Sequence, residues 1–324
     1  MIVITLVALA AGFASALMFI SIISGAPVSL LLVYFAPLPL MVAALGWGPL
    51  AATIGGIAAA TTIGAIFGLT HCIGFAVTVA LPAWWLGHLA LLGRPANVAA
   101  PGDGNAPAAQ TLEWYPAGRI LLWISGIAVL TTLIGLLTLS SDIVVITTTL
   151  RRALMRLAAL RGPTSAAEIE QHAEALVAII PPFVGILIMM RLTLNLWLAA
   201  KIAATSGRLH RDKPDLKSAT LPPMTLVALC VALAFCFVGG LFGMLAQIVA
   251  AALMMAYALT GFAVLHTLTL GWKSRGFWLG CTYAIVFLSG GWLLVVMLVL
   301  GLADALFGFR DRYLRARPPP IPAS

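Results

Sequence analysis

Almost the whole chain, from Met1 to about Phe309, is a succession of apolar stretches that are each long enough to cross a lipid bilayer. A helix needs about 20 mostly apolar residues to span the hydrocarbon core, so little sequence is left for a soluble domain. Hydrophobic residues make up 62% of the chain and charged residues 9%, whereas charged residues make up about 25% of soluble domains. The sequence therefore predicts an integral membrane protein with many spans.

The spans are predicted to be α-helices. Barrel strands alternate polar and apolar side chains, and stretches such as Ile120–Leu139 do not. A helix also pairs its own backbone groups inside the hydrocarbon. We expect an all-α, polytopic transmembrane helical bundle of about eight or nine spans, which forms a single integral membrane domain over residues 1–309. The direct count gives nine spans: Ile2–Ile23, Val28–Leu45, Pro49–Leu69, Cys72–Leu92, Arg119–Leu139, Leu176–Ala200, Met224–Leu241, Met244–Leu270 and Phe277–Leu300.

The connections between the spans differ in composition. Residues 94–116 are rich in Pro, Gly, Ala and Asn, which predicts a flexible loop. Residues 201–222 form a basic loop, and residues 310–324 form a basic, Pro-rich tail. Only Phe242-Gly243 separates the seventh and eighth spans, which predicts a helical hairpin or one broken element. Because Lys and Arg divide almost equally between the two sides, the orientation stays open.

The segment at about 140–175 is predicted to hold an amphipathic helix. Asp142 is a good N-cap residue, and leucines that include Leu150 alternate with Arg151, Arg152 and Arg156. This spacing gives one apolar face and one basic face, which is typical of a helix lying on the membrane surface. The alternative is an extension of the preceding span beyond the bilayer.

Arg191 is the most unusual residue within a span. It lies about 15 Å of helical rise before Lys201, and a charge at such a depth is costly and usually faces the bundle interior or a water-filled cavity. One interpretation is a guanidinium that faces an anion or substrate, with Asn195 one helical turn away as a second polar group. The alternative is that Arg191 extends to an interface, or pairs with a carbonyl or an acid on another helix.

Three further polar residues are candidates for a site. Asp304 precedes the arginines of the tail, so we expect a structural ion pair with one of them or with Arg191. Gln247 and His266 lie in the eighth predicted span, where a hydrogen bond between helices is a more frequent role than ligand binding.

The sequence lacks the motifs of the intramembrane enzymes that we considered. It has no metalloprotease, rhomboid-type or aspartyl-protease signature, and no phosphate-binding loop, so we expect no catalysis and no ATP hydrolysis by this chain. No metal or cofactor is predicted, because the cysteines show no CxxC spacing. The net charge of +8 is explained by Lys and Arg beside anionic lipid, so the lipid bilayer is the expected partner and nucleic acid is not.

Small residues recur at a spacing of four, as in Gly12-xxx-Ala16 and Gly64-xxx-Gly68. Such pairs let two helices approach closely, although a chain rich in Ala and Gly produces them by chance as well.

Several short segments resemble a known family. Ala256–His266, Gly301–Arg312, Trp114–Arg119 and the stretch from Asn195 to Arg208 resemble the YybS-like family of uncharacterised bacterial multi-pass membrane proteins, which carry a domain of unknown function. The resemblance implies a location in the bacterial inner (plasma) membrane but no established activity. Family members look distantly similar to the substrate-binding membrane subunits of vitamin-uptake transporters, which implies separate membrane or ATPase partner subunits.

Three functions remain open at this point. The first is a transporter or a substrate-binding transporter subunit, which Arg191 and Asn195 favour. The second is a membrane scaffold or partner protein in envelope biogenesis, which the lack of convergent charges favours. The third is an enzyme that acts on lipid, which only scattered His and Asp residues favour. Convergence of the candidate residues on one cavity would favour transport, and separate satisfied pairs would favour the scaffold.

Overall fold

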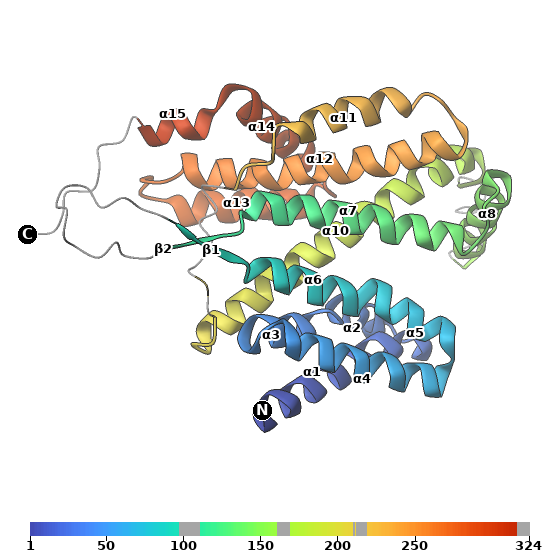
Figure 1. The fold of residues 1–324 in the computed structure, drawn as a ribbon. Helices are drawn as coiled ribbons and strands as arrows, with labels where there is room; N and C mark the ends of the chain where they lie inside the picture. Colours follow the sequence, from blue (N-terminus) through green and yellow to red (C-terminus); the bar gives the residue numbers. More distant parts are fainter. Residues whose placement is uncertain (97–110, 161–168, 210, 212–218, 316–324) are drawn as a thin grey trace, which may run out of the picture. The chain divides into compact units, whose positions relative to one another are not determined.

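The computed structural model describes residues 1–96, 111–160, 169–209, 211 and 219–315. These residues form helices apart from one short pair of strands and the connections (Figure 1), which confirms the all-α prediction. Within them, seven helices are long and apolar enough to cross a membrane, or eight if one bent pair of helices counts as one span. The chain is therefore a multi-span membrane protein, and this count agrees with the lower of the two predicted values.

Contacts divide the chain into two compact units. Unit 1 comprises Met1–Ile124 and Met190–Pro214, and unit 2 comprises Ser125–Met189 and Asp215–Ser324. Helix α7 (Ala117–Leu137) and helix α10 (Ala173–Thr205) each contribute to both units. The prediction of one integral membrane domain over residues 1–309 stays a prediction.

Unit 1 contains the first six α-helices. Their bounds are α1 (Ile2–Ile20), η1 (Ser21–Ser24, a 3-10 turn), α2 (Pro27–Phe35), α3 (Leu38–Trp47), α4 (Pro49–Phe67), α5 (Leu69–Phe75), η2 (Ala76–Ala80, a π-helical turn) and α6 (Leu81–Ala90). Helices α1 and α4 pack with their backbones in close approach, because a Cβ atom on Gly12 or Gly55 would collide with a carbonyl oxygen of the other helix. The predicted small-residue position at Gly12 is thus used in helix packing.

Two of the spans in unit 1 contain an irregular turn. The helix of the second span is irregular at Ala36 and Pro37, between α2 and α3, and Pro37 is the N-cap residue of α3. The fourth span contains η2, in which the amide of Leu81 donates to the carbonyl of Ala76 five residues back. π-helical turns of this kind occur often at functional sites.

Unit 2 is organised around α12 (Gly240–Leu268), which is the most buried of the candidate spans. Helix α11 (Met224–Phe235) packs beside it as the other arm of a hairpin (Figure 1). The break between them lies at residues 236–239, where Gly239 has a φ of 78°. Phe242-Gly243 was predicted as the break but lies inside α12, because the left-handed backbone of Gly239 turns the chain earlier.

The last predicted span is two helices. Helix α13 (Arg275–Leu288) and helix α14 (Leu293–Phe307) are separated at Gly290 and Gly291, which have φ values of 61° and 94°. Helix α14 continues into α15 (Phe309–Arg315) with a bend of 66°. The predicted span Phe277–Leu300 is therefore replaced by a short apolar helix and a bent pair.

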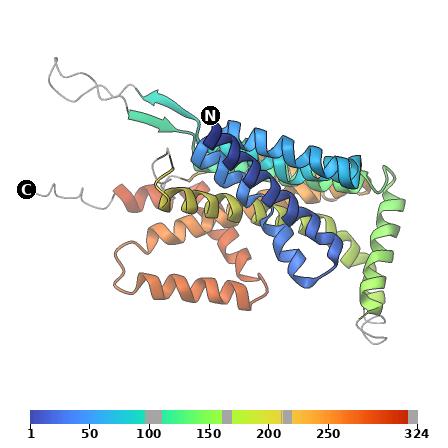
Figure 2. The ribbon, with the colours of Figure 1, turned by 90° about the horizontal axis from the view of Figure 1, so that it is seen from below.

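Helix α8 (Ile143–Ala159) lies in the segment predicted to be amphipathic. The carboxylate of Asp142 accepts a hydrogen bond from the amide of Val144 at 2.8 Å, which confirms the N-cap. The apolar face of α8 packs on protein, since Ile146 is buried with Leu136 of α7 and Met244 of α12. Figure 2 shows α8, in green, running steeply across the direction of α7.

The ends of the predicted loop at 94–116 pair as strands. Strand β1 (Gly93–Ala96) and strand β2 (Thr111–Trp114) are antiparallel, with Gly93 opposite Trp114. Arg94 and Glu113 form an exposed ion pair at 2.7 Å across this pair of strands. Residues 97–110 of that loop, residues 210 and 212–218 of the basic loop, and the tail from residue 316 lie outside the described residues.

Candidate functional site

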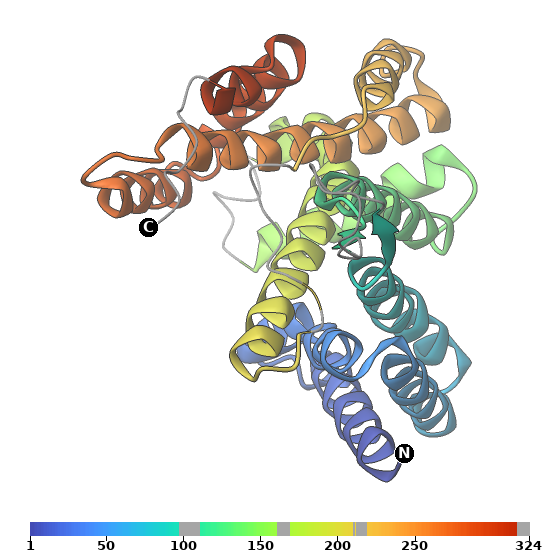
Figure 3. The same cartoon turned by 60° about the vertical axis from the view of Figure 1, so that its left-hand side comes forward.

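Arg191 lies deep within α10, the longest helix of the chain. It stands about 27 Å of helical rise from Ala173 and about 21 Å from Thr205. Figure 3 shows this C-terminal part of α10, in yellow, beside the blue helices of unit 1. Among the described residues, no carboxylate lies within 4.0 Å of the guanidinium. The predicted charge within a span is therefore present, and no acidic side chain neutralises it.

The partner of the Arg191 guanidinium is a backbone carbonyl in the π-helical turn η2. Nη2 of Arg191 donates to the carbonyl of Thr78 at 3.3 Å, and Thr78 lies inside the π-helical turn η2. Pro82 follows four residues later and has no amide hydrogen, so the usual helical donor to Thr78 is absent. A side chain from a neighbouring helix can satisfy such a carbonyl within a membrane.

Asn195 connects α10 to the last turn of α2. Its amide nitrogen donates to the carbonyl of Tyr34 at 3.0 Å and to the carbonyl of Arg191 at 2.7 Å. Tyr34 lies in the last turn of α2, where carbonyls lack a partner within the helix. Because both neighbours are acceptors, the nitrogen of the amide must face them, and the side-chain oxygen points elsewhere.

Two polar atoms of this site remain without a partner. Nε of Arg191 is a buried donor and Oδ1 of Asn195 is a buried acceptor, and neither makes a hydrogen bond with any residue that the structure describes. Asn195 as a whole is fully buried. Buried polar groups almost always have partners, so a donor and an acceptor left open on adjacent turns of one helix require an explanation. An acceptor for Nε and a donor for Oδ1 would be needed to satisfy both atoms.

Arginines that follow α10 pack on the ends of unit 1 helices. Arg211 donates to the carbonyls of Ala90 and Tyr115 at 3.0 and 3.1 Å, and burial lowers the pKa of its guanidinium. The guanidinium of Arg208 lies 5.1 Å from the ring centroid of Trp47. The described residues of the basic loop thus attach to the end of α6 and to an indole at the end of α3.

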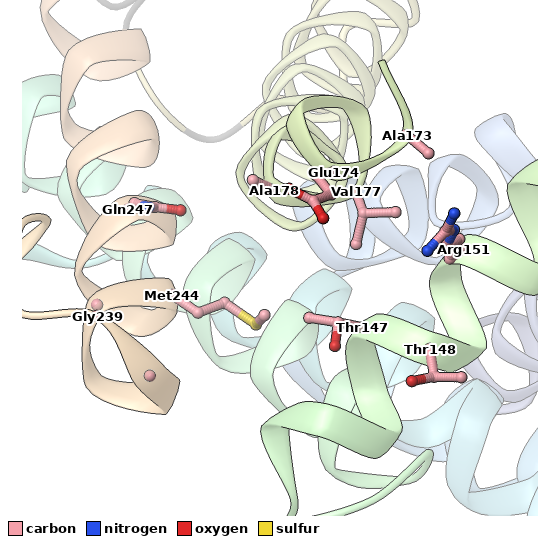
Figure 4. Close-up of a pocket in the computed structure, with 12 residues that line it drawn as sticks. Thr147, Thr148, Arg151, Ala173, Glu174, Val177, Ala178, Gly239, Met244 and Gln247 are labelled. Carbon is pink, nitrogen blue, oxygen red and sulfur yellow. The ribbon is translucent and has the colours of Figure 1, made fainter. Parts of the chain in front are cut away.

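Gln247 lines a pocket in unit 2 (Figure 4). The pocket has a volume of about 440 Å³ and lies between α8, the start of α10 and the start of α12. Its lining residues are Thr147, Thr148, Arg151, Ala173, Glu174, Val177, Ala178, Gly239, Gly240, Gly243, Met244 and Gln247. Gln247 therefore faces this pocket, and its predicted hydrogen bond between helices stays a prediction.

Asp304 forms a buried ion pair with Arg310. Its Oδ2 accepts from Nε of Arg310 at 2.7 Å, and its Oδ1 accepts from the Arg310 amide at 2.9 Å. Nη1 of Arg310 also donates to the carbonyl of Ala219 at 3.0 Å. The predicted pairing with an arginine of the tail is thus present, and both carboxylate oxygens of Asp304 are engaged by Arg310.

His266 forms a pair with Tyr283. Nε2 of His266 lies 2.9 Å from the Tyr283 hydroxyl, across α12 and α13. This contact is a hydrogen bond between helices, as predicted for His266. Among the described residues, no hydrogen bond or ion pair joins Gln247, His266 and Asp304 to one another.

Sequence reasoning missed three groups of the Arg191–Asn195 site. They are the carbonyls of Tyr34 and Thr78 and the missing amide of Pro82. A proline inside an apolar stretch signals that the carbonyl four residues earlier needs another donor. The identity of that donor depends on packing between helices, and no local pattern contains it.

Comparisons with known proteins return no match: no family model, no curated protein and no solved structure resembles this chain. Within the described residues, no group of three or more His, Cys, Asp or Glu side chains is arranged to hold a metal ion.

Proposed function

We propose that this chain is a component of solute transport across a bacterial inner membrane, and that Arg191 and Asn195 bind the anionic end of the solute. The observation that carries the proposal is the pair of buried, unpartnered atoms, Nε of Arg191 and Oδ1 of Asn195. A guanidinium offers five donors in a planar fork that suits carboxylates and phosphates. An unpaired charge within a span is costly, and such residues usually mark the path of a substrate or ion.

The irregular turns of two spans support this proposal. The last turn of α2 and the π-helical turn η2 each present a carbonyl to α10. π-helical turns occur often at functional sites. A small solute with an anionic group and a neighbouring N–H or O–H would satisfy the free donor and the free acceptor together.

The proposed partners follow from the same assignment. We infer a place in the YybS-like family of uncharacterised membrane proteins, and transport coupled to separate membrane or ATPase partner subunits. Such a partner would supply the nucleotide hydrolysis for which this chain has no phosphate-binding loop. We assign no catalytic step to the chain.

A membrane scaffold in envelope biogenesis is the second candidate. Two polar pairs of unit 2 favour it, since Asp304 is fully engaged with Arg310 and His266 with Tyr283. In that case the contact of Arg191 with Thr78 would be purely structural, a replacement for the missing amide of Pro82. The two functions therefore predict different results of replacing Arg191: loss of a bound anion for transport, and loss of the contact with Thr78 alone for the scaffold.

Substitution of Arg191 by Leu is expected to weaken retention of a bound anion by about 10- to 100-fold, because hydrogen bonds to a charged group contribute about 1.5–3 kcal/mol. The measurement is affinity purification from native membranes in mild detergent, with mass spectrometry of the retained small anions and subunits. Lys201→Leu is the matched control, since it removes one exposed charge from the same helix.

A second pair of variants separates binding from folding. Pro82→Ala restores an amide that can serve the Thr78 carbonyl, so Arg191→Leu/Pro82→Ala should fold well and still fail to retain the anion. If the double variant and the wild type retain the same small anions, or if both retain none while envelope-assembly proteins copurify, transport is excluded and the scaffold is supported.

A further inference from the structure

Helix α8 lies at the level where two spans end. It begins at Ile143, six residues after α7 ends at Leu137, and six residues reach at most about 20 Å. The buried contact of Ile146 with Met244 places α8 beside the first turns of α12 as well. Since spans end at the headgroup region, α8 belongs to the interface rather than to the hydrocarbon core.

The basic side chains of α8 are exposed, and two of the three have no acidic partner among the described residues. Arg151, Arg152 and Arg156 are all exposed. Arg151 forms an ion pair with Glu170, whereas neither Arg152 nor Arg156 has an acidic partner among the described residues. Because Ile146 and its neighbours pack on the opposite face, these two charges point away from the core of unit 2.

The outward face of α8 also has a hollow and an exposed apolar side chain. A hollow of about 440 Å³ is lined by Thr148, Arg151, Arg152, Met155, Arg156 and Ala159. Val144, one turn before Thr148 on this side of the helix, is 65% exposed, which is unfavourable in water. The combination of an exposed aliphatic side chain and arginines without an acidic partner among the described residues suits the boundary between acyl chains and headgroups.

We propose that the basic face of α8 is a docking surface for anionic phospholipid, with Arg152 and Arg156 bound to headgroup phosphates. Each basic residue near an anionic bilayer contributes attraction that corresponds to about fivefold in relative affinity. The inference does not depend on the function proposed for Arg191, because it concerns residues of unit 2 only.

Arg152→Gln/Arg156→Gln is expected to lower the preference for phosphatidylglycerol over phosphatidylcholine by about 25-fold, at about fivefold per arginine. The full-length protein is purified in neutral detergent, each lipid is titrated, and retained lipid is counted by native mass spectrometry. Arg152→Lys/Arg156→Lys should keep most of the preference. Arg312→Gln/Arg315→Gln removes the same net charge from exposed positions of α15 and should lower the preference by less than the substitutions in α8.

Three outcomes would overturn the proposal. They are an unchanged preference in the Gln pair, an equal loss in the α15 control, and full competition by inorganic phosphate at matched ionic strength, which would indicate a site for a soluble anion. A measurement without substitutions gives a second test. Hydrogen exchange of the α8 amides should be slower in nanodiscs that contain phosphatidylglycerol than in pure phosphatidylcholine, and equal exchange would contradict lipid docking.

Discussion

Replacement of Asp304 by Ala is expected to lower the free energy of unfolding by about 3–5 kcal/mol, the typical cost of leaving one member of a buried ion pair unpaired. Asp304 and Arg310 are only 6% and 4% exposed. The carboxylate accepts from both the side chain and the amide of Arg310, so its loss leaves a buried guanidinium and a buried amide without that partner. Reversible unfolding in mixed micelles measures the effect.

Two variants control the Asp304 prediction. Asp311→Ala removes a neighbouring exposed carboxylate and should change the free energy of unfolding by less than about 0.5 kcal/mol. Asp304→Leu/Arg310→Met removes both charges and should recover most of the loss, because buried ion pairs exchange for apolar side chains at little cost. Equal stability of Asp304→Ala and Asp311→Ala would show that the pair does not hold α14 to α15.

The spans were predictable because one physical constraint dominates them. Hydrocarbon tolerates only long apolar helices, and hydropathy detects those directly, as for α1, α4 and α7. Hydropathy does not detect a change in backbone direction within an apolar stretch. The break between α13 and α14 at Gly290 and Gly291 was therefore missed, although two consecutive glycines are a recognisable turn signal.

The candidate site was predictable only in part, because its members differ in sequence separation. Asp304 and Arg310 lie six residues apart, so their pairing followed from local sequence. The partners of Arg191 and Asn195 lie more than 100 residues away, and only the packing of helices determines which carbonyl meets which side chain. Sequence identified the polar residues of α10 but not the groups that they contact.

Substitution of Gly261 or Gly301 by Ala is expected to destabilise unit 2 by about 3 kcal/mol, at the upper end of the usual cost of overpacking. A Cβ atom on Gly261 would collide with the carbonyl oxygen of Met297, and one on Gly301 with that of Tyr257. These obstacles are backbone atoms of α14 and α12, so the helices themselves must move apart. The close crossing of α12, in orange, with α14, in red, is visible in Figure 3.

Gly280→Ala is the matched control for the Gly261 prediction, because a Cβ atom at Gly280 meets nothing within 4 Å. Ala is the better helix former by about 1 kcal/mol, so this variant should be neutral or slightly more stable. Gly261→Ala/Gly301→Ala should cost less than the sum of the single variants, because helices already separated by one methyl group have room for the other. If Gly261→Ala unfolds at the same denaturant concentration as Gly280→Ala, the backbones of α12 and α14 are not in close contact at Gly261.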